Sequence, residues 1–169
     1  MDAWLDRVRA DSGGLPRQEY DPEWPSPCQV GPPDANGMIQ WQPVERDLSA
    51  DFSGLARALE APVHPDFQAY YGSYWCDSFE VQAPAGGLTL LQVWNQADFE
   101  RLIGNLLGHT LVKQKAREPL TLFFACTDED DLFLSLENHS GRILLERPGH
   151  KPLRELAPDL AAFLGRLRA

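Results

Sequence analysis

Apolar residues recur with a helical period between positions 95 and 117. Asn95 is a residue type that caps helices, an acid follows it at Asp98, and Trp94 with Phe99 can pack across the first turn as a hydrophobic staple. The apolar positions are spaced as one buried stripe, and they are Phe99, Leu102, Ile103, Leu106, Leu107, Thr110 and Leu111. The segment ends in basic residues, which favour the helix dipole. The pattern therefore predicts one long amphipathic helix.

Alternation of apolar and polar residues predicts strands on both sides of this helix. Residues 79–82 and 88–93 flank a Gly-Gly pair that can form a tight turn, so we expect a β-hairpin. Residues 38–42 alternate in the same way. After the helix, three apolar segments are separated by an acidic turn and by an Asn-His-Ser-Gly turn, and they span residues 120–125, 132–136 and 142–145. We expect these three to be consecutive antiparallel strands.

The rest of the chain predicts shorter helices and an irregular arm. The helices are expected at residues 2–10, 52–59 and 153–167. Residues 1–33 are expected to form an irregular N-terminal arm, rich in proline after the first helix and anchored by burial of Trp24. Strands occur in runs and do not alternate with helices, which favours an α+β fold. We predict a single domain, residues 1–169, with a mainly antiparallel sheet of about five to six strands packed with helices.

Composition limits the classes of partner. The 169 residues carry a formal net charge of −10, which argues against nucleic acid and against attraction to anionic lipid. The three cysteines are odd in number and form no CxxC pair, as expected of reduced thiols in the cytosol. The acidic N-terminus does not match a signal peptide. The apolar uncharged run at residues 102–112 is shorter than the ~18 residues of a membrane span.

Acidic and basic residues are segregated along the sequence. Residues 58–100 and 119–141 contain no Lys or Arg, whereas bases gather in residues 101–118 and 142–169. A domain built from such blocks can present an acidic face, which suits a basic partner. The carboxylates that we expect to contact this partner are Asp66, Asp77, Glu80, Asp98 and Glu100, with the acidic turn Asp128, Glu129, Asp130 and Asp131 as a second patch.

Several residues in these segments also have purely structural interpretations. Helix capping alone accounts for Asp98, and solvation between two strands accounts for the acidic turn. Tyr71, Trp75 and Phe79 suit a hydrophobic core, whereas an exposed ring among the aromatic residues between 70 and 79 would serve as an apolar anchor for a partner.

Catalytic motifs are not apparent in the sequence. His109 borders the apolar stripe, as a packed or hydrogen-bonded histidine would, and close backbone packing would explain Gly104 and Gly108. The acids around Cys76 predict a raised thiol pKa, which is unfavourable for a nucleophile. A metal-dependent hydrolase that uses the acidic turn with His109 or His139 is an alternative, but the spacing matches no EF-hand. We expect no catalytic residue, no cofactor and no metal.

The strand-to-helix motif resembles the signature of the Syd family of bacterial SecY-interacting proteins. The motif comprises residues 88–95, Asp98-Phe99 and residues 105–109. Further matches follow in the family's order, at residues 25–28, 41–43, 71–73, 121–123, Asn138, Ser140-Gly141, Leu160 and residues 163–164. The resemblance implies a SUKH-like fold and a small cytoplasmic protein held peripherally at the inner membrane by the translocon subunit SecY. It also implies an electronegative concave surface that meets the cytosolic loops of SecY.

The charge pattern and the resemblance lead to one functional expectation. Cytoplasmic loops of membrane proteins carry excess Lys and Arg, so an acidic domain finds complementary charge there. We expect a non-enzymatic binding protein that regulates or monitors SecY through an acidic groove. The alternative is an immunity or adaptor protein of the SUKH type that neutralises a basic partner such as a toxin.

Overall fold

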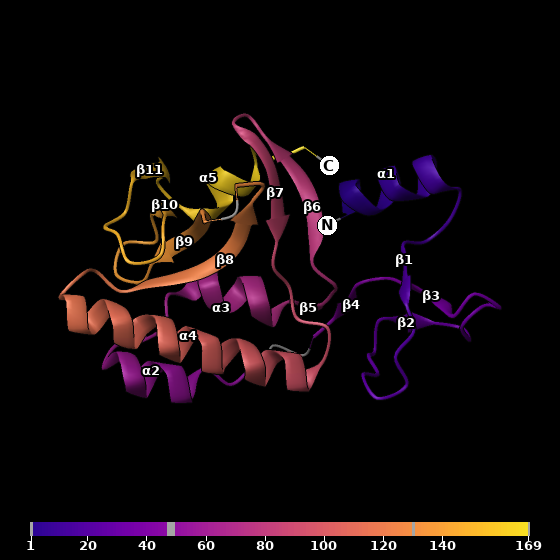
Figure 1. Ribbon diagram of the computed structural model, residues 1–169, viewed down its shortest axis with the longest axis horizontal. Helices are drawn as coiled ribbons and strands as arrows, with labels where there is room; N and C mark the ends of the chain where they lie inside the picture. The colour runs from indigo at the N-terminus through magenta and orange to yellow at the C-terminus, as the bar shows by residue number, and fades with distance from the viewer. Residues whose placement is uncertain (1, 47–49, 130, 169) are drawn as a thin grey trace.

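The computed structural model describes residues 2–46, 50–129 and 131–168. A six-stranded antiparallel sheet dominates the fold, in the order β11-β10-β9-β8-β7-β6 (Figure 1). Its strands are β6 (Phe79–Ala83), β7 (Gly86–Leu90), β8 (Thr121–Thr127), β9 (Phe133–Glu137), β10 (Ile143–Glu146) and β11 (Arg154–Ala157). The fold is therefore α+β with a mainly antiparallel sheet, as the sequence predicts.

Consecutive strands of this sheet are neighbours, and the connection between β7 and β8 contains the helix α4. In the hairpin of β6 and β7, Phe79 pairs with Leu90 at one end and Ala83 with Gly86 at the other. Gly86 has φ of 143°, a conformation that L side chains rarely adopt, so glycine is needed at this turn. The predicted hairpin and the predicted run of three strands after the long helix are confirmed. The turn of the hairpin is Pro84-Ala85 and not the predicted Gly-Gly pair, which forms the start of β7.

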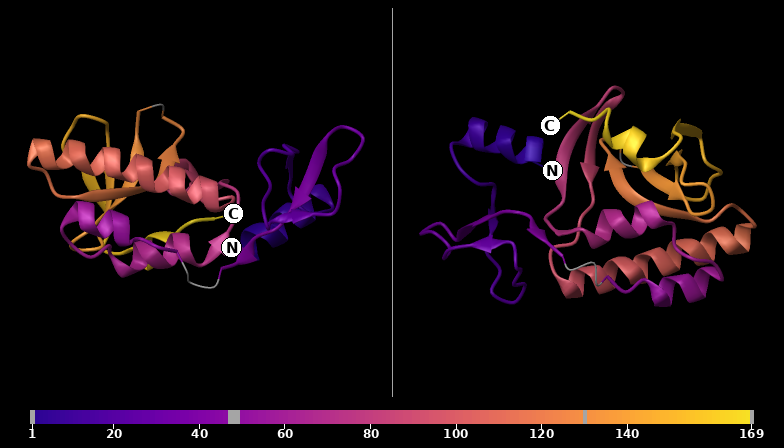
Figure 2. Two further views of the ribbon diagram at one scale, coloured as in Figure 1. Left: turned by 90° about the horizontal axis from the view of Figure 1, so that it is seen from below. Right: turned by 180° about the vertical axis from the view of Figure 1, so that it is seen from behind.

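Helices cover both faces of the sheet, and two adjacent residues of β8 contact different helices. The ring of Phe123 contacts His109 of α4 (Gln96–Ala116), with ring centroids 5.7 Å apart. The next residue, Phe124, contacts Tyr70 of α3 (Pro65–Gly72) and Phe163 of α5 (Leu160–Leu164). The pairing of β8 with β9 shifts register between Phe123 and Ala125, and Figure 2 shows α4 on one side of the sheet with α3 and α5 on the other.

The predicted helix over 52–59 is α2 (Ser53–Leu59), which packs along α4. Phe52, just before it, contacts Phe67 of α3 and Phe99 of α4 by edge-on ring contacts. These aromatic rings join the three helices into one core with the sheet. Among the described residues, none of the helices combines the length and the apolar content needed to cross a bilayer.

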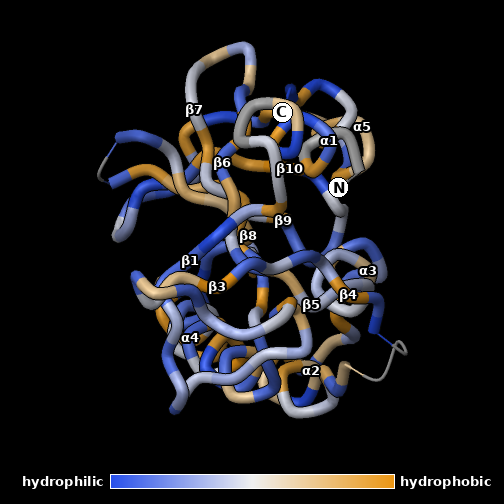
Figure 3. The backbone as a smooth tube through the Cα atoms, turned by 90° about the vertical axis from the view of Figure 1, so that its right-hand side faces the viewer, coloured by the Kyte–Doolittle hydropathy of each residue, from blue (hydrophilic) through white to orange (hydrophobic). Residues whose placement is uncertain are grey.

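The N-terminal region forms a separate small layer beside the sheet. It holds α1 (Asp2–Ser12) and the sheet of β1 (Arg17–Glu19), β3 (Met38–Trp41) and β2 (Gln29–Val30). A two-stranded ladder of β4 (Val44–Glu45) and β5 (Tyr74–Trp75) follows it. Figure 2 shows this layer projecting from the body. In Figure 3, β1 and β3 lie in front of the region between the β6–β7 hairpin and α4.

Four details correct the sequence predictions. Residues 153–167 are not one helix, because Arg154–Ala157 pair with β10 as strand β11 and only Leu160–Leu164 are helical. The helix α3 was not predicted. Leu111, placed in the buried stripe of α4, is 52% exposed. Gly104 and Gly108 lie on the exposed side of α4, and an added Cβ at either would meet no atom within 4 Å, so close packing does not explain them.

Candidate functional site

The start of α4 holds the N-terminal arm against the body. The side chain of Asn95 accepts a hydrogen bond from the Asp98 N–H (2.9 Å) and donates one to the Pro25 carbonyl (2.9 Å). The indole N–H of Trp94 donates to the Trp24 carbonyl (3.2 Å). The predicted cap at Asn95 is thus confirmed, and the same residue fastens the arm. Backbone carbonyls of the arm, together with the half-buried ring of Trp24, anchor it.

Two adjoining cavities lie between the arm, the β6–β7 hairpin and α4. One has a volume of about 370 Å³ and is lined by residues that include Gln18, Trp24 and Asp98. The other, of about 460 Å³, is lined by residues that include Arg17 and Glu80. Asp77 and Ser78 line both cavities. We call the two cavities together the Asp77 groove.

Asp77 has an unusual electrostatic position in this groove. Its carboxylate is half-buried and accepts a hydrogen bond from the Ser78 N–H (2.8 Å). Burial raises the pKa of Asp77, and the nearby charge of Asp98 raises it further. Within the described part of the chain, no Lys, Arg or His forms an ion pair with Asp77. A cation entering the groove would favour the charged form of Asp77, which burial and the charge of Asp98 disfavour.

Asp98 lies in the same groove but already has partners. One carboxylate oxygen accepts a hydrogen bond from the Trp94 N–H (2.9 Å), and the other pairs with Arg101 (2.6 Å). The guanidinium of Arg101 lies over the ring of Trp24, 5.3 Å from its centroid. Capping and the ion pair therefore account for Asp98, as the structural interpretation expected. Trp24 and Arg101 are groove residues that the charge pattern missed, although Arg101 stands at the i+3 position that pairs with an acid on a helix.

The other predicted carboxylates are divided among separate places. Glu80 lies on β6 and lines the Asp77 groove. Glu100 is exposed on α4, outside the groove lining, and accepts a hydrogen bond from Gln96 (3.1 Å). Asp66 is in the first turn of α3, where its N–H donates to the ring of His64 (3.2 Å).

The acidic turn is remote from the Asp77 groove. Asp128 and Glu129 follow β8 at the end where Thr127 pairs with Leu88, whereas Asp77 precedes β6 at the opposite end of the hairpin. Asp131 pairs with Arg147 (2.8 Å). Asp130 lies outside the described residues. The structure thus brings together Asp77, Glu80 and Asp98, and it separates them from Asp66 and the acidic turn.

The residues considered for catalysis have structural partners. His109 forms a hydrogen bond of 2.9 Å with Thr121 and lies between the rings of Phe123 and Phe133, and burial lowers its pKa. Burial is the main reason why the pKa of Cys76 is raised, with the Asp77 charge contributing as expected. Across the described residues, no three His, Cys, Asp or Glu side chains are grouped as a metal site.

The aromatic residues near the groove belong to the core or to its border. Tyr71 and Phe79 are buried, as expected, and Trp75 is half-buried with the guanidinium of Arg46 3.7 Å from its ring centroid. Tyr70 and Tyr74 are half-buried too. None of these five rings is exposed. The aromatic residues that line the groove are Trp24, Trp41, Phe79, Trp94 and Phe123, of which Trp24 comes from the arm and is half-buried.

The fold and the groove define a small α+β protein with a recess between an N-terminal arm and its sheet, lined by the acids Asp77, Glu80 and Asp98 and by the bases Arg7, Arg17 and Arg101. A family model described as Syd protein (SUKH-2) matches residues 1–169. A protein named Protein Syd from Pseudoalteromonas atlantica is 44% identical over 160 residues, covering 94% of this chain and 84% of that protein. Another, from Colwellia psychrerythraea, is 38% identical over 164 residues, covering 92% and 82%. The chain belongs to the Syd family.

Proposed function

We propose that this protein is a non-enzymatic binding protein whose Asp77 groove docks on basic cytosolic loops of SecY. The observation that carries the proposal is the half-buried carboxylate of Asp77, which has no ion-pair partner among the described residues and lies where two cavities meet. The protein would then act on the cytoplasmic side of the inner membrane, held there peripherally through SecY. Its binding would regulate or monitor the translocon.

The position of Asp77 supports a cationic occupant beside it, in a groove that Arg7, Arg17 and Arg101 also line. Burial and the neighbouring Asp98 both disfavour the charged form of Asp77. A Lys or Arg of the partner would offset both effects and lower the pKa of Asp77, because an opposite charge nearby favours the ionised form. Glu80 would provide a further acceptor in the adjoining cavity. The planar ring of Trp24 offers the apolar contact that exposed ion pairs need for useful affinity.

The net charge supports the approach of such a partner. A formal charge of −10 attracts basic loops over a distance of about 8 Å at physiological salt. Cytoplasmic loops of membrane proteins carry excess Lys and Arg, which gives SecY loops the required sign. Binding should therefore weaken as salt is raised.

The test is a pull-down with inverted membrane vesicles that contain or lack SecY, at rising salt. We expect retention on the SecY membranes only, and loss of retention at high salt. Asp77→Asn should weaken retention about tenfold, whereas Glu100→Gln, which removes an exposed carboxylate outside the groove, should not. Equal retention on both membranes would contradict the SecY proposal, and equal effects of the two variants would contradict the role of the groove.

A basic toxin would meet the same carboxylates, as the immunity alternative requires. The vesicle experiment separates the two, because a toxin-binding protein would show no dependence on SecY. In that case Asp77→Asn would still weaken binding to a basic peptide, so the partner and the groove are tested independently.

A further inference from the structure

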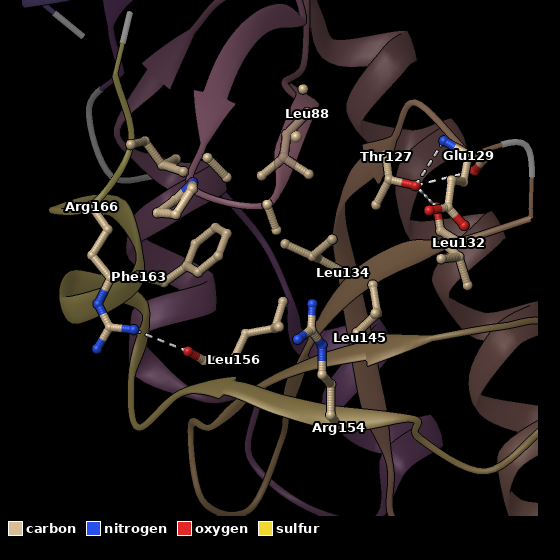
Figure 4. A pocket seen from close by; sticks show the side chains of 16 residues that line it. Leu88, Thr127, Glu129, Leu132, Leu134, Leu145, Arg154, Leu156, Phe163 and Arg166 are labelled. Atoms are coloured by element: carbon tan, nitrogen blue, oxygen red, sulfur yellow. Dashed lines mark hydrogen bonds between the residues drawn. The ribbon is translucent and has the colours of Figure 1, made fainter.

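An apolar cavity lies at the end of the β6–β7 hairpin that is remote from the Asp77 groove. It has a volume of about 260 Å³ and shares no lining residue with the groove. Its walls are formed by Leu88 of β7, Leu134 of β9, Leu145 of β10, Leu156 of β11 and Phe163 of α5 (Figure 4). Apolar recesses of this kind, with a few polar groups at the rim, are the usual form of small-ligand sites.

The walls of this cavity are held by the pairing of the C-terminal segment. Gln82 on β6 and Arg168 exchange two backbone hydrogen bonds of 2.8 Å each. Because β6 and β11 are the two edges of the sheet, the segment after α5 joins one edge to the other. It thereby holds Phe163 over the face of the sheet that Leu134 and Leu156 line. Regular elements, and not a mobile surface loop, therefore form most of the cavity.

Two arginines give the cavity a positively charged side within an acidic protein. Arg154 alternates with Glu155 along β11 and shares the face of Leu156, and in Figure 4 its side chain points toward the middle of the cavity. Glu155 lies on the other face and pairs with Arg142 (3.1 Å). Arg154 forms no ion pair or side-chain hydrogen bond within the described ranges.

The second arginine is Arg166, which lies beside β11 as well. Arg166 donates one hydrogen bond to the Leu156 carbonyl (3.2 Å), which leaves its other N–H groups free for a ligand. The carboxylate that lines the cavity is Glu129, at the Thr127 side and away from the two arginines (Figure 4). The arrangement therefore offers an apolar interior, an anion-binding side and an acidic side.

We propose that this cavity binds a single-chain amphiphile with an anionic head, of the class of medium-chain carboxylates. The apolar chain would lie among the leucines and Phe163, and the carboxylate would accept hydrogen bonds from the planar guanidinium of Arg154, with Arg166 as the second donor. Such a ligand matches both the apolar walls and the charge of the rim, whereas a purely apolar ligand would leave Arg154 without a partner. The proposal does not rest on the Asp77 groove.

Calorimetric titration of the full chain with hexanoate, octanoate and decanoate tests this site. We expect decanoate to bind with a dissociation constant on the order of 10 to 100 µM. Each added methylene should tighten binding about threefold to fourfold until the cavity is full. Decanol, which has the same chain and no charge, should bind at least about tenfold more weakly than decanoate. Equal binding of the two, or no binding of decanoate at millimolar concentration, would overturn the proposal.

Variants at the rim test the position of the head. Arg154→Gln, an exposed change that leaves the walls intact, should weaken decanoate binding about tenfold, whereas Lys151→Gln, an exposed change outside the cavity, should not. Unchanged binding to Arg154→Gln would overturn the assignment. The source of the ligand is tested with vesicles of phosphatidylglycerol and of phosphatidylcholine. If the protein binds phosphatidylglycerol vesicles selectively and Arg154→Gln abolishes this binding, the natural ligand is an anionic lipid. If the protein binds free decanoate but neither kind of vesicle, the natural ligand is a soluble fatty acid.

Discussion

Lys113 of α4 and Glu146 of β10 form an ion pair that is buried on both sides. Their side chains are 7% and 0% exposed. Glu118 also accepts a hydrogen bond from Lys113 (3.0 Å), and Ser135 donates one to Glu146. Burial alone would lower the pKa of Lys113, but the hydrogen bonds that it donates to Glu146 and Glu118 outweigh this effect, and the pKa is raised. The pair fastens the C-terminal half of α4 to the sheet.

Lys113→Met should lower the free energy of unfolding by about 3–5 kcal/mol, because it leaves Glu146 buried without a cation. Adding Glu146→Gln, which keeps an acceptor for Ser135, should recover part of this loss. Urea denaturation at pH 7 measures both variants. Lys115→Met, an exposed change two residues away, should stay within about 0.5 kcal/mol of the unchanged protein. Additive effects of the two buried changes would contradict the pairing.

The same pair gives a prediction for alkaline pH. A lysine whose folded pKa is raised contributes stability that is fully present below its unfolded pKa of about 10.4 and is lost as pH rises through the folded value. The difference in unfolding free energy between the protein and Lys113→Met should therefore be constant at neutral pH and shrink as pH rises above about 10.4.

Features encoded within a few neighbouring residues were predictable from the sequence. The start of α4 depends on Asn95 and Asp98, which are three positions apart, and the β6–β7 hairpin depends on alternation on both sides of the short turn at Pro84-Ala85. The buried role of Lys113 was not predictable, because its partner Glu146 is 33 residues away and a basic residue near a helix end is ordinarily exposed. The strand β11 was missed because Leu153 and Leu156 also fit a helical spacing, and pairing with β10 decided otherwise.

The shape of the candidate site was not predictable from the charge pattern. Segregated charge predicts an acidic surface, and Asp77, Glu80 and Asp98 border one groove together with Arg7, Arg17 and Arg101. Which carboxylates share a face depends on how the β6–β7 hairpin folds. The pairing of its strands places Asp77 and Asp128 at opposite ends of the hairpin. The arm residue Trp24 reaches the groove through hydrogen bonds to residues 70 positions later in the chain, which no local pattern indicates.

Gly141→Ala should lower the free energy of unfolding by about 2–4 kcal/mol. Gly141 is buried with φ of 77°, and an added Cβ would lie 2.7 Å from the Nε2 atom of His64, whose ring caps α3. Gly149→Ala is the matched control, since Gly149 has φ of 75° but open space around it, and it should cost about 1 kcal/mol. Thermal unfolding compares the two, and equal losses would show that the contact with His64 is unimportant.

Asn95→Asp should keep the cap of α4 but loosen the arm. Aspartate caps helices as well as asparagine does, yet it cannot donate to the Pro25 carbonyl and would place a negative charge against it. We expect a loss of about 1–2 kcal/mol in unfolding free energy and faster trypsin cleavage after Arg17. Gln96→Glu also replaces a side-chain amide by a carboxylate, at the next residue and away from the arm. Trypsin should cleave this variant at the same rate as the unchanged protein. Similar cleavage of both variants would show that Asn95 does not fasten the arm.

Asp77→Asn should make the protein more stable at pH 7 while it weakens partner binding. Burial and the charge of Asp98 raise the folded pKa of Asp77, so its charged form opposes folding above that pKa, and this cost disappears once pH falls below the unfolded value of about 3.9. Asparagine retains the oxygen that accepts the Ser78 N–H and removes the charge.

Urea denaturation of the Asp77→Asn variant at pH 7 and near pH 3 measures this difference, which should be positive at pH 7 and vanish in acid. Glu100→Gln should change neither stability nor binding. A loss of stability at pH 7 in Asp77→Asn would mean that the fold itself requires the carboxylate. A gain in stability together with about tenfold weaker binding is the combination expected of a residue kept charged for its partner, because function then opposes stability at that position.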